Sequence, residues 1–241
     1  SSPAARRSSW RSAPGGARRG RSGTAGLRLA FVSPLPPAPT GVADYAADVL
    51  ELLALTAMEP PALFEADALR DEKVKVLRAV RKCTQSVRGQ YHGYREETGV
   101  GTDSKTATYA ALEFFVDNWR WQGVPFYLRS GKAMSCGTTQ LVIQFREPPY
   151  LLFDSGPRNH REANRLVIQI QPAEGIQLHF HTKVPDAGMQ LRMTDLSFRF
   201  REKFAGPMPE AYERLLLDAI NGDASLFARA DEVEAAWSIV D

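Results

Sequence analysis

The sequence predicts an α+β domain, with helices packed on one face of an open, mostly antiparallel, multi-stranded sheet. The first observation is the order of the elements, because helical patterns give way to a long run of strand patterns and then return. The second is the alternation of apolar and polar residues within those strand patterns, which is typical of a sheet covered on one side. The length of 241 residues allows one large domain or two small ones.

Residues 1–26 are predicted to be disordered. They consist mainly of Ser, Ala, Gly and Arg and have no hydrophobic period, so they cannot bury enough apolar surface to offset the loss of chain entropy on folding. No acidic residue occurs before Asp44, and an Arg- and Ser-rich start without acids also fits an organellar transit peptide. Translated linker sequence has the same composition, and both interpretations stay open.

Residues 27–50 are predicted to form a strand, a loop and the start of a helix. Residues 27–33 are strand-like, residues 34–41 form a loop rich in Pro, and a helix begins at Val42. The phrases F-V-S-P-L-P-P and T-G-V-A-D-Y resemble the N-terminal start of family-4-type glycosyltransferases, which implies the opening unit of a nucleotide-binding domain. Because no second strand of that kind follows, we expect this segment to complete no parallel sheet and to carry no chemistry by itself.

Two helices are expected next. The first is lined by apolar side chains and ends before Pro60, because proline cannot continue a helix. Its apolar residues are Leu50, Leu52, Leu53, Leu55 and Met58. The second covers residues 71–82 and has acids in its first turn and bases in its last, as the helix dipole favours. Its apolar stripe consists of Val74, Leu77 and Val80.

The hydrophobic period then changes to two residues. Within residues 106–121, alternate residues from Ala110 to Val116, including Leu112 and Phe114, can share one face of a strand. Further strands are expected at residues 124–128, 138–145, 165–171, 175–183 and 191–199. Helices are expected again at residues 209–221 and 230–240.

Composition excludes two classes of partner. With 30 basic and 28 acidic residues the net charge is +2, so we expect no nucleic-acid partner. No apolar run approaches the roughly 20 residues that cross a bilayer, so we expect no membrane partner. The two cysteines, Cys83 and Cys136, lie far apart and outside any C-x-x-C spacing, which favours free thiols in a reducing compartment. We therefore expect a cytoplasmic protein.

Local motifs give little chemistry by themselves. The chain contains no Gly-rich phosphate loop and no zinc-ligand spacing. His179 and His181 share a strand face, but a polar outer face explains them better than a metal, and we predict no metal site. The phrase most typical of a binding site is Arg129-Ser-Gly131-Lys132 at a strand end, where Gly allows a turn and the following Lys can reach a phosphate or a sugar hydroxyl.

Seven phrases from about residue 51 to residue 241 resemble the C-terminal domain of glucose-6-phosphate dehydrogenases. They include D-N-W-R-W-Q-G-V-P-F-Y-L-R-S-G-K at 117–132 and N-R-L-V-I-Q-I-Q-P at 164–172. The others lie at residues 53–61, 70–78, 88–94, 211–218 and 229–237, in the order of the family. The resemblance implies oxidation of D-glucose 6-phosphate to 6-phosphogluconolactone with NADP as hydride acceptor, which is the entry to the oxidative pentose phosphate pathway.

The resemblance also implies two substrate contacts. Lys132 matches the lysine of the R-x-G-K phrase, which reaches the sugar hydroxyls, and Gln171 matches the glutamine of the V-Q-P phrase near the same ligand. A second basic residue is usual five positions after the lysine, and Gly137 stands there in this chain. We expect Lys132 and Gln171 to keep residual contacts with glucose 6-phosphate.

The cofactor and the catalytic base are expected to be absent from this chain. The family binds its hydride acceptor on a Rossmann domain with a Gly-rich loop, and no such loop occurs in these 241 residues. Asp48 stands where the catalytic histidine is expected, so no catalytic residue is assigned. Arg129 fits a second, structural NADP site, but three nearby positions that would need bases are neutral. They are Gln169, Gln177 and Val142.

Three functional hypotheses follow. The first is a truncated or fused, catalytically incompetent glucose-6-phosphate dehydrogenase. The second is a non-catalytic association module, because the resemblance implies a homo-oligomer formed through the sheet, to which part of an aromatic cluster would contribute. The cluster comprises Trp119, Trp121, Phe126 and Tyr127. The third hypothesis, a glycosyltransferase fragment, rests on residues 27–50 alone.

Overall fold

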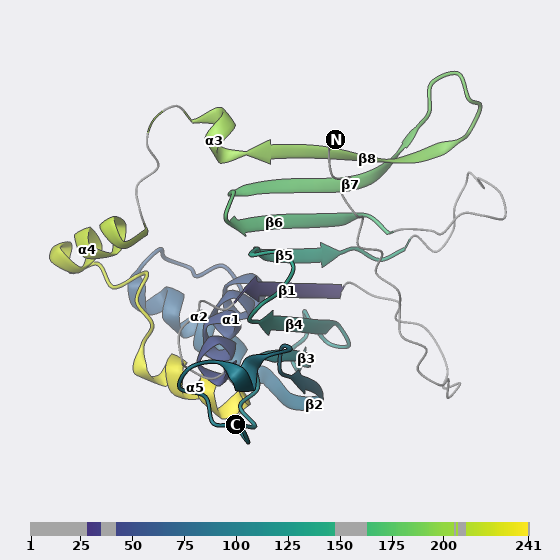
Figure 1. Ribbon diagram of the computed structural model, residues 1–241. Coiled ribbons are helices and arrows are strands. Elements are labelled where there is room, and N and C mark those ends of the chain that lie inside the picture. The colour runs from purple at the N-terminus through teal and green to yellow at the C-terminus, as the bar shows by residue number, and fades with distance from the viewer. Residues whose placement is uncertain (1–27, 35–41, 148–162, 205, 207–210, 241) are drawn as a thin grey trace.

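The computed structural model describes residues 28–34, 42–147, 163–204, 206 and 211–240, and these form one eight-stranded sheet with helices beside it (Figure 1). The strands are β1 (Arg28–Pro34), β2 (Val80–Gly89), β3 (Tyr109–Val116), β4 (Pro125–Gly131), β5 (Thr139–Gln144), β6 (Arg165–Gln171), β7 (Gly175–Lys183) and β8 (Leu191–Arg199). The helices are α1 (Val42–Ala57), α2 (Ala66–Ala79), the short 3-10 turn η1 (Tyr94–Glu96), α3 (Phe200–Lys203), α4 (Ala211–Asn221) and α5 (Ala230–Val240). The strand order is β2-β3-β4-β1-β5-β6-β7-β8.

The predicted fold class is confirmed. Every described strand pair except one is antiparallel. The bounds of β6, β7 and β8 are those that the alternation predicts, and α5 also has its predicted bounds. The predicted face of β3 is confirmed as well, because Ala110, Phe114 and Val116 are buried and Leu112 packs against the core.

The exception is β1, which forms one parallel pair within the otherwise antiparallel sheet. β1 pairs parallel with β4 and antiparallel with β5, so it lies between two strands that follow each other in the sequence. Leu29 is fully buried opposite Phe126 on one side and Ile143 on the other. A parallel partner needs to be near in space only, and here it is a strand that comes almost one hundred residues later in the chain.

A single helix, α1, crosses the position near residue 50 where the two sequence resemblances meet. It runs without interruption from Val42 to Ala57. Its buried residues Leu50, Leu53, Ala54 and Ala57 recur at helical spacing and face the sheet. Leu55 was expected on the apolar side but is 44% exposed, because it falls between those positions on the helix.

The helix expected at residues 71–82 is displaced, and the strand β2 that follows it was missed. The helix α2 ends at Ala79, and Val80 has an extended backbone and pairs with Val116 of β3. Val80 extends the helical apolar stripe in sequence, but it is β-branched and gains a cross-strand partner in the sheet. The residues after it are mostly polar, and a register shift occurs in β2 between Arg81 and Gln85, so no alternation reveals this strand in the sequence.

The core lies between the lower half of the sheet in Figure 1 and the helices α1, α2 and α5. Trp121 ties the loop after β3 to α1, because its Nε1 donates a hydrogen bond to the Ala57 carbonyl at 2.8 Å and its ring meets Phe126 edge-on at 5.3 Å. The other two members of the predicted aromatic cluster face solvent, since Trp119 is 99% exposed and Tyr127 is exposed as well.

A buried ionic group joins the three core helices. Lys73 of α2 is almost fully buried and forms ion pairs with Glu232 of α5, which is fully buried, and with Glu51 of α1 at 3.4 Å. Glu232 also accepts a hydrogen bond from the backbone N–H of Arg229 at 3.3 Å, at the start of α5. Burial raises the pKa of the Glu51 carboxyl, and the Lys73 ammonium offsets part of that effect.

The strands β6, β7 and β8 extend beyond these helices (Figure 1). Leu196 and Ile176 are exposed there, and α4 also presents exposed apolar side chains, including Tyr212 and Ile220. Within the described ranges, no helix is both long and apolar enough to span a lipid bilayer.

Candidate functional site

The residues that the sequence singles out lie where several strands end, along one side of the sheet that is called the strand-end edge. The register sets Gly89, Tyr109, Gly131 and Pro34 side by side across β2, β3, β4 and β1. This is the edge where the arrowheads of β4 and β6 lie in Figure 1. Lys132 directly follows Gly131, so the end of β4 determines where its side chain starts.

The backbone of Lys132 is held by Thr108, which is 2% exposed. Lys132 donates its N–H to the Thr108 carbonyl at 2.8 Å, while Thr108 donates its own N–H to the Gly89 carbonyl at 2.8 Å. The Thr108 hydroxyl accepts the N–H of Tyr91 at 3.0 Å. Thr108 is therefore hydrogen-bonded to two other chain segments, the one at residues 89–91 and the one at Lys132. Sequence reasoning missed Thr108, because two of these three hydrogen bonds use its backbone N–H and C=O groups, which nearly every residue has.

The glycine before Lys132 is required by the space around it. A Cβ atom at Gly131 would lie 2.8 Å from Cδ2 of Tyr109 and 3.0 Å from Sδ of Met134. Ala133, just after the lysine, has a φ of 51°, in the left-handed region that non-glycine residues seldom adopt. A tight turn thus begins at Gly131, and Lys132 stands at its start with a half-buried side chain.

Gln171 lies at the same edge. It ends β6, pairs with Thr139 at the start of β5, and is exposed. The strands β4 and β6 are separated by β1 and β5, which makes about 14 Å at roughly 4.8 Å per strand spacing. Lys132 and Gln171 therefore lie at the same side of the sheet, with two strands between β4 and β6.

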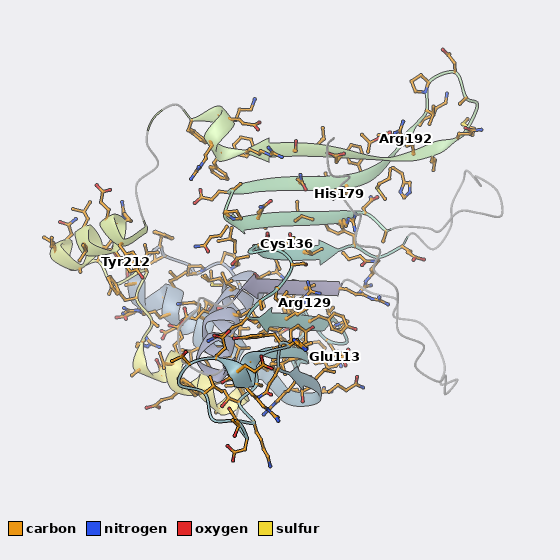
Figure 2. All side chains as sticks on the ribbon, viewed as in Figure 1. Glu113, Arg129, Cys136, His179, Arg192 and Tyr212 are labelled. Carbon is orange, nitrogen blue, oxygen red and sulfur yellow. The ribbon has the colours of Figure 1, made fainter. Side chains whose placement is uncertain are left out.

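Arg129 lies elsewhere, on the sheet face away from the helices. It is two residues before the end of β4, on the opposite face from buried Leu128. Figure 2 shows it beside β3, the strand that carries Glu113. Glu113 pairs with Tyr127, and partial burial, followed by a hydrogen bond with Glu113, raises the pKa of the Tyr127 hydroxyl.

The residues around Arg129 do not fit a dinucleotide phosphate. The register places Gln140 and Gln169 in line with Arg129 across β5 and β6, and Val142 and Gln177 lie on the same face one row away. These side chains are neutral, whereas phosphate groups are held by several cations or backbone N–H groups. This face therefore lacks the cations that a second NADP would need beside Arg129.

The remaining residues that the sequence analysis named are an acid, two cysteines and two histidines. The side chain of Asp48 lies outside the described residues, although its backbone belongs to α1. Cys136 is an exposed free thiol in the loop after β4, as predicted, and the side chain of Cys83 is outside the described part. His179 and His181 are two residues apart in β7 and so lie on the same face of the strand. Among the described residues, no group of three or more His, Cys, Asp or Glu could hold a metal.

Comparison with known proteins finds one family. Residues 45–241 match the model of the family described as "Glucose-6-phosphate dehydrogenase, C-terminal domain". The chain is 43% identical over 208 residues to a glucose-6-phosphate 1-dehydrogenase of Aggregatibacter actinomycetemcomitans, covering 80% of this chain and 41% of that protein. The chain thus spans about two fifths of the length of such curated relatives.

Solved structures agree with this match. A crystal structure of glucose-6-phosphate 1-dehydrogenase from Mycobacterium avium superposes with a TM-score of 0.73 at 36% identity, over 89% of this chain and 48% of that one. A glucose-6-phosphate dehydrogenase in complex with its substrate glucose-6-phosphate gives the same TM-score at 34% identity, over 88% of this chain and 47% of that one.

Proposed function

We propose, from the premise that this chain belongs to the family of glucose-6-phosphate dehydrogenase C-terminal domains, that it forms the sugar-facing wall of an NADP-dependent glucose-6-phosphate dehydrogenase. One observation carries the proposal: Lys132 stands at a rigid strand end, on the same sheet edge as Gln171. A related structure of the same fold was determined with glucose 6-phosphate as its substrate, which supports a sugar phosphate as the ligand of this edge.

The chemistry of the two side chains suits that ligand. The Lys132 ammonium offers three donors and a positive charge, which match sugar hydroxyls and a nearby phosphate dianion. The Gln171 amide both donates and accepts, so it can distinguish hydroxyl orientations. Since the backbone of Lys132 is hydrogen-bonded to buried Thr108, little backbone entropy is lost when the ligand binds.

The hydride acceptor must be bound by residues outside this wall. The 241 residues contain no G-x-G-x-x-G loop, and the face around Arg129 does not fit a dinucleotide. Hydride transfer needs donor and acceptor held together in one pocket. We therefore propose that this chain binds glucose 6-phosphate weakly and does not turn it over by itself. NADP as the acceptor, the oxidation of glucose 6-phosphate and a cytoplasmic location are proposals that rest on the family.

A titration of the chain with glucose 6-phosphate tests this proposal. We expect weak binding that the substitution Lys132→Ala reduces by about tenfold, because one charged hydrogen-bonding group contributes roughly 1.5 kcal/mol. The matched control is Lys183→Ala, since Lys183 is exposed at the far end of β7, at the opposite edge of the sheet. Equal loss in both variants, or no binding by the unaltered chain, would reject the assignment of the site.

The second hypothesis, an association module, is favoured by a separate observation. The core helices stop short of β6, β7 and β8, where Leu196 is 62% exposed and Ile176 and Phe204 are also exposed. Apolar side chains gathered on one part of a surface are typical of contact regions. We propose that copies of the chain associate through this part of the sheet, and a strictly monomeric species in sedimentation at micromolar concentration would reject it.

The glycosyltransferase resemblance of residues 27–50 stays a prediction about the sequence. In the fold, β1 and α1 are parts of the sheet domain, and Leu29 and Leu50 belong to its core. We therefore base no activity on that segment.

A further inference from the structure

The loop between β2 and β3, residues 90–108, contains the threonine that holds the backbone of Lys132. The backbone hydrogen bonds described within this loop join residues three positions apart, as when Ser104 donates its N–H to the Gly101 carbonyl at 3.0 Å. Such turns shape each arm of the loop separately. They do not by themselves determine how the two arms lie against each other, and so they do not determine where Thr108 lies.

The side chain of Gln90 joins the two arms. Its Nε2 donates to the Ser104 carbonyl at 2.8 Å and to the Thr106 carbonyl at 2.9 Å. Its Oε1 accepts a hydrogen bond from Nε of Arg95 at 3.1 Å. Both amide hydrogens of this half-buried side chain are therefore used. The opposite orientation of the amide would set its oxygen against two carbonyl oxygens, so the loop determines which amide atom faces it.

The same stretch of chain is connected to Lys132 through Thr108. The residues on either side of Gln90 both bond to this threonine, because the Gly89 carbonyl accepts its N–H at 2.8 Å and Tyr91 donates its N–H to the hydroxyl at 3.0 Å. Thr108 is buried, and its carbonyl accepts the N–H of Lys132 at 2.8 Å. The two carbonyls that Gln90 binds lie just before Thr108 in the chain, so the amide restrains the segment that leads into this contact.

We propose that Gln90 is a positioning residue of the strand-end edge, whose amide holds the loop so that Thr108 fixes the backbone of Lys132 for glucose 6-phosphate. This inference rests on the function proposed above and extends its site from the end of β4 into the loop after β2. Gln90 acts through Lys132. Its contribution to the affinity therefore exists only while the lysine side chain is present, and this condition separates it from a residue that merely stabilises the fold.

A double-mutant cycle between Gln90 and Lys132 tests the proposal in the full chain, with the binding of glucose 6-phosphate followed by NMR titration. Gln90→Met keeps the length of the side chain and its neutrality but removes both donors. We expect it to weaken binding about fivefold, because two hydrogen bonds that hold the loop are lost. In a Lys132→Ala background the same substitution should cause no further loss of affinity.

The matched control is Arg95→Ala. It removes the side-chain partner of the Gln90 oxygen but leaves both donors to the loop carbonyls in place, and Arg95 itself is exposed. We expect this variant to bind glucose 6-phosphate as the unaltered chain does. If Arg95→Ala weakens binding as much as Gln90→Met, the contact with Arg95 accounts for the effect and the proposed action through the loop carbonyls is overturned.

Hydrogen exchange gives a second measurement that needs no ligand. The N–H of Lys132 is protected by its bond to Thr108, so Gln90→Met should speed its exchange about tenfold by freeing the loop. The amide of Leu128, which is buried within β4, should keep its exchange rate because the core is not altered. Equal acceleration at both amides would show a general loss of stability and would overturn the positioning role.

The outcomes separate this inference from the function on which it rests. If the unaltered chain binds no glucose 6-phosphate, both are overturned. If Lys132→Ala weakens binding and Gln90→Met does not, the proposed site stands and the positioning role is overturned. An equal loss from Gln90→Met with and without the lysine also overturns the role, since the effect then does not pass through Lys132. A loss that disappears in the Lys132→Ala background supports it.

Discussion

At Gly131 the sheet edge has no room for a Cβ atom. The nearest obstacles are the ring of Tyr109 and the sulfur of Met134, and both belong to side chains that must shift if a methyl group is added. The sequence pattern suggests a turn at this glycine, but only the structure shows that the glycine also allows β3 and the loop after Lys132 to pack closely. The position of the candidate substrate lysine therefore depends on an absent side chain.

We predict that Gly131→Ala destabilises the fold by about 1 to 3 kcal/mol, the usual effect of overpacking. Chemical denaturation gives the free energy of unfolding. Gly137→Ala is the matched control in the same loop, because nothing lies within 4 Å of its Cβ position, and we expect it to change stability little. Equal effects at both positions would contradict the steric account.

The buried group of Lys73, Glu51 and Glu232 has one more carboxylate than ammonium. Glu51 is the member with a raised pKa, mainly because of burial, so its ionised form is disfavoured in the folded state. A carboxyl whose pKa is raised on folding contributes stability at pH values below its ordinary 4.5, and this contribution is lost as the pH rises through the folded value.

We therefore predict that Glu51→Gln makes the fold relatively more stable above that range, while it matches the unaltered chain at lower pH. Thermal unfolding from acid to neutral pH measures the difference. Glu213→Gln, on exposed α4, removes a carboxylate without touching the buried group and serves as the control. A Glu51→Gln variant that loses stability at neutral pH would show that the Lys73 ion pair outweighs the burial of Glu51.

At the scale of elements, β1 shows the limit of reasoning along the chain. Its apolar run predicts a strand, but no local pattern says that the strand will lie between β4 and β5. Strand pairing is non-local, and the register of β1 depends on side chains about one hundred residues away in the chain. The alternation in β6, β7 and β8 predicted their bounds because those strands form a simple meander. The strand β2 has no alternation, so tertiary pairing alone reveals it.

The burial of Leu29 leads to a prediction about this central strand. Leu29→Ala should destabilise the fold by about 2 to 5 kcal/mol, as leucine truncations in well-packed cores do. The control is Val87→Ala on the edge strand β2, where the side chain is 64% exposed and little apolar burial is lost. If urea unfolding showed a similar small effect for both, β1 would not be part of the core.

At the scale of the whole molecule, the helices cover the half of the sheet that contains β4, which ends next to Lys132, and leave β7 and β8 outside that half (Figure 1). The chain spans about two fifths of its relatives, and its core is nevertheless complete around Phe114, Phe126 and Leu29. The local phrase at a strand end pointed to Lys132, but the resemblance was needed to assign it, since a lysine at a strand end is common; Gln171 was found by resemblance alone. The structure adds that they share an edge, which neither composition nor spacing could predict.

The central proposal is that this chain provides the sugar-facing wall of a pocket and that the hydride acceptor is bound by residues outside that wall. The most direct test is the formation of NADPH by the purified chain in the presence of glucose 6-phosphate and NADP. The account predicts no turnover above a blank without protein, because a donor without a positioned acceptor does not react at an enzymatic rate. Clear turnover that depends on glucose 6-phosphate would contradict it.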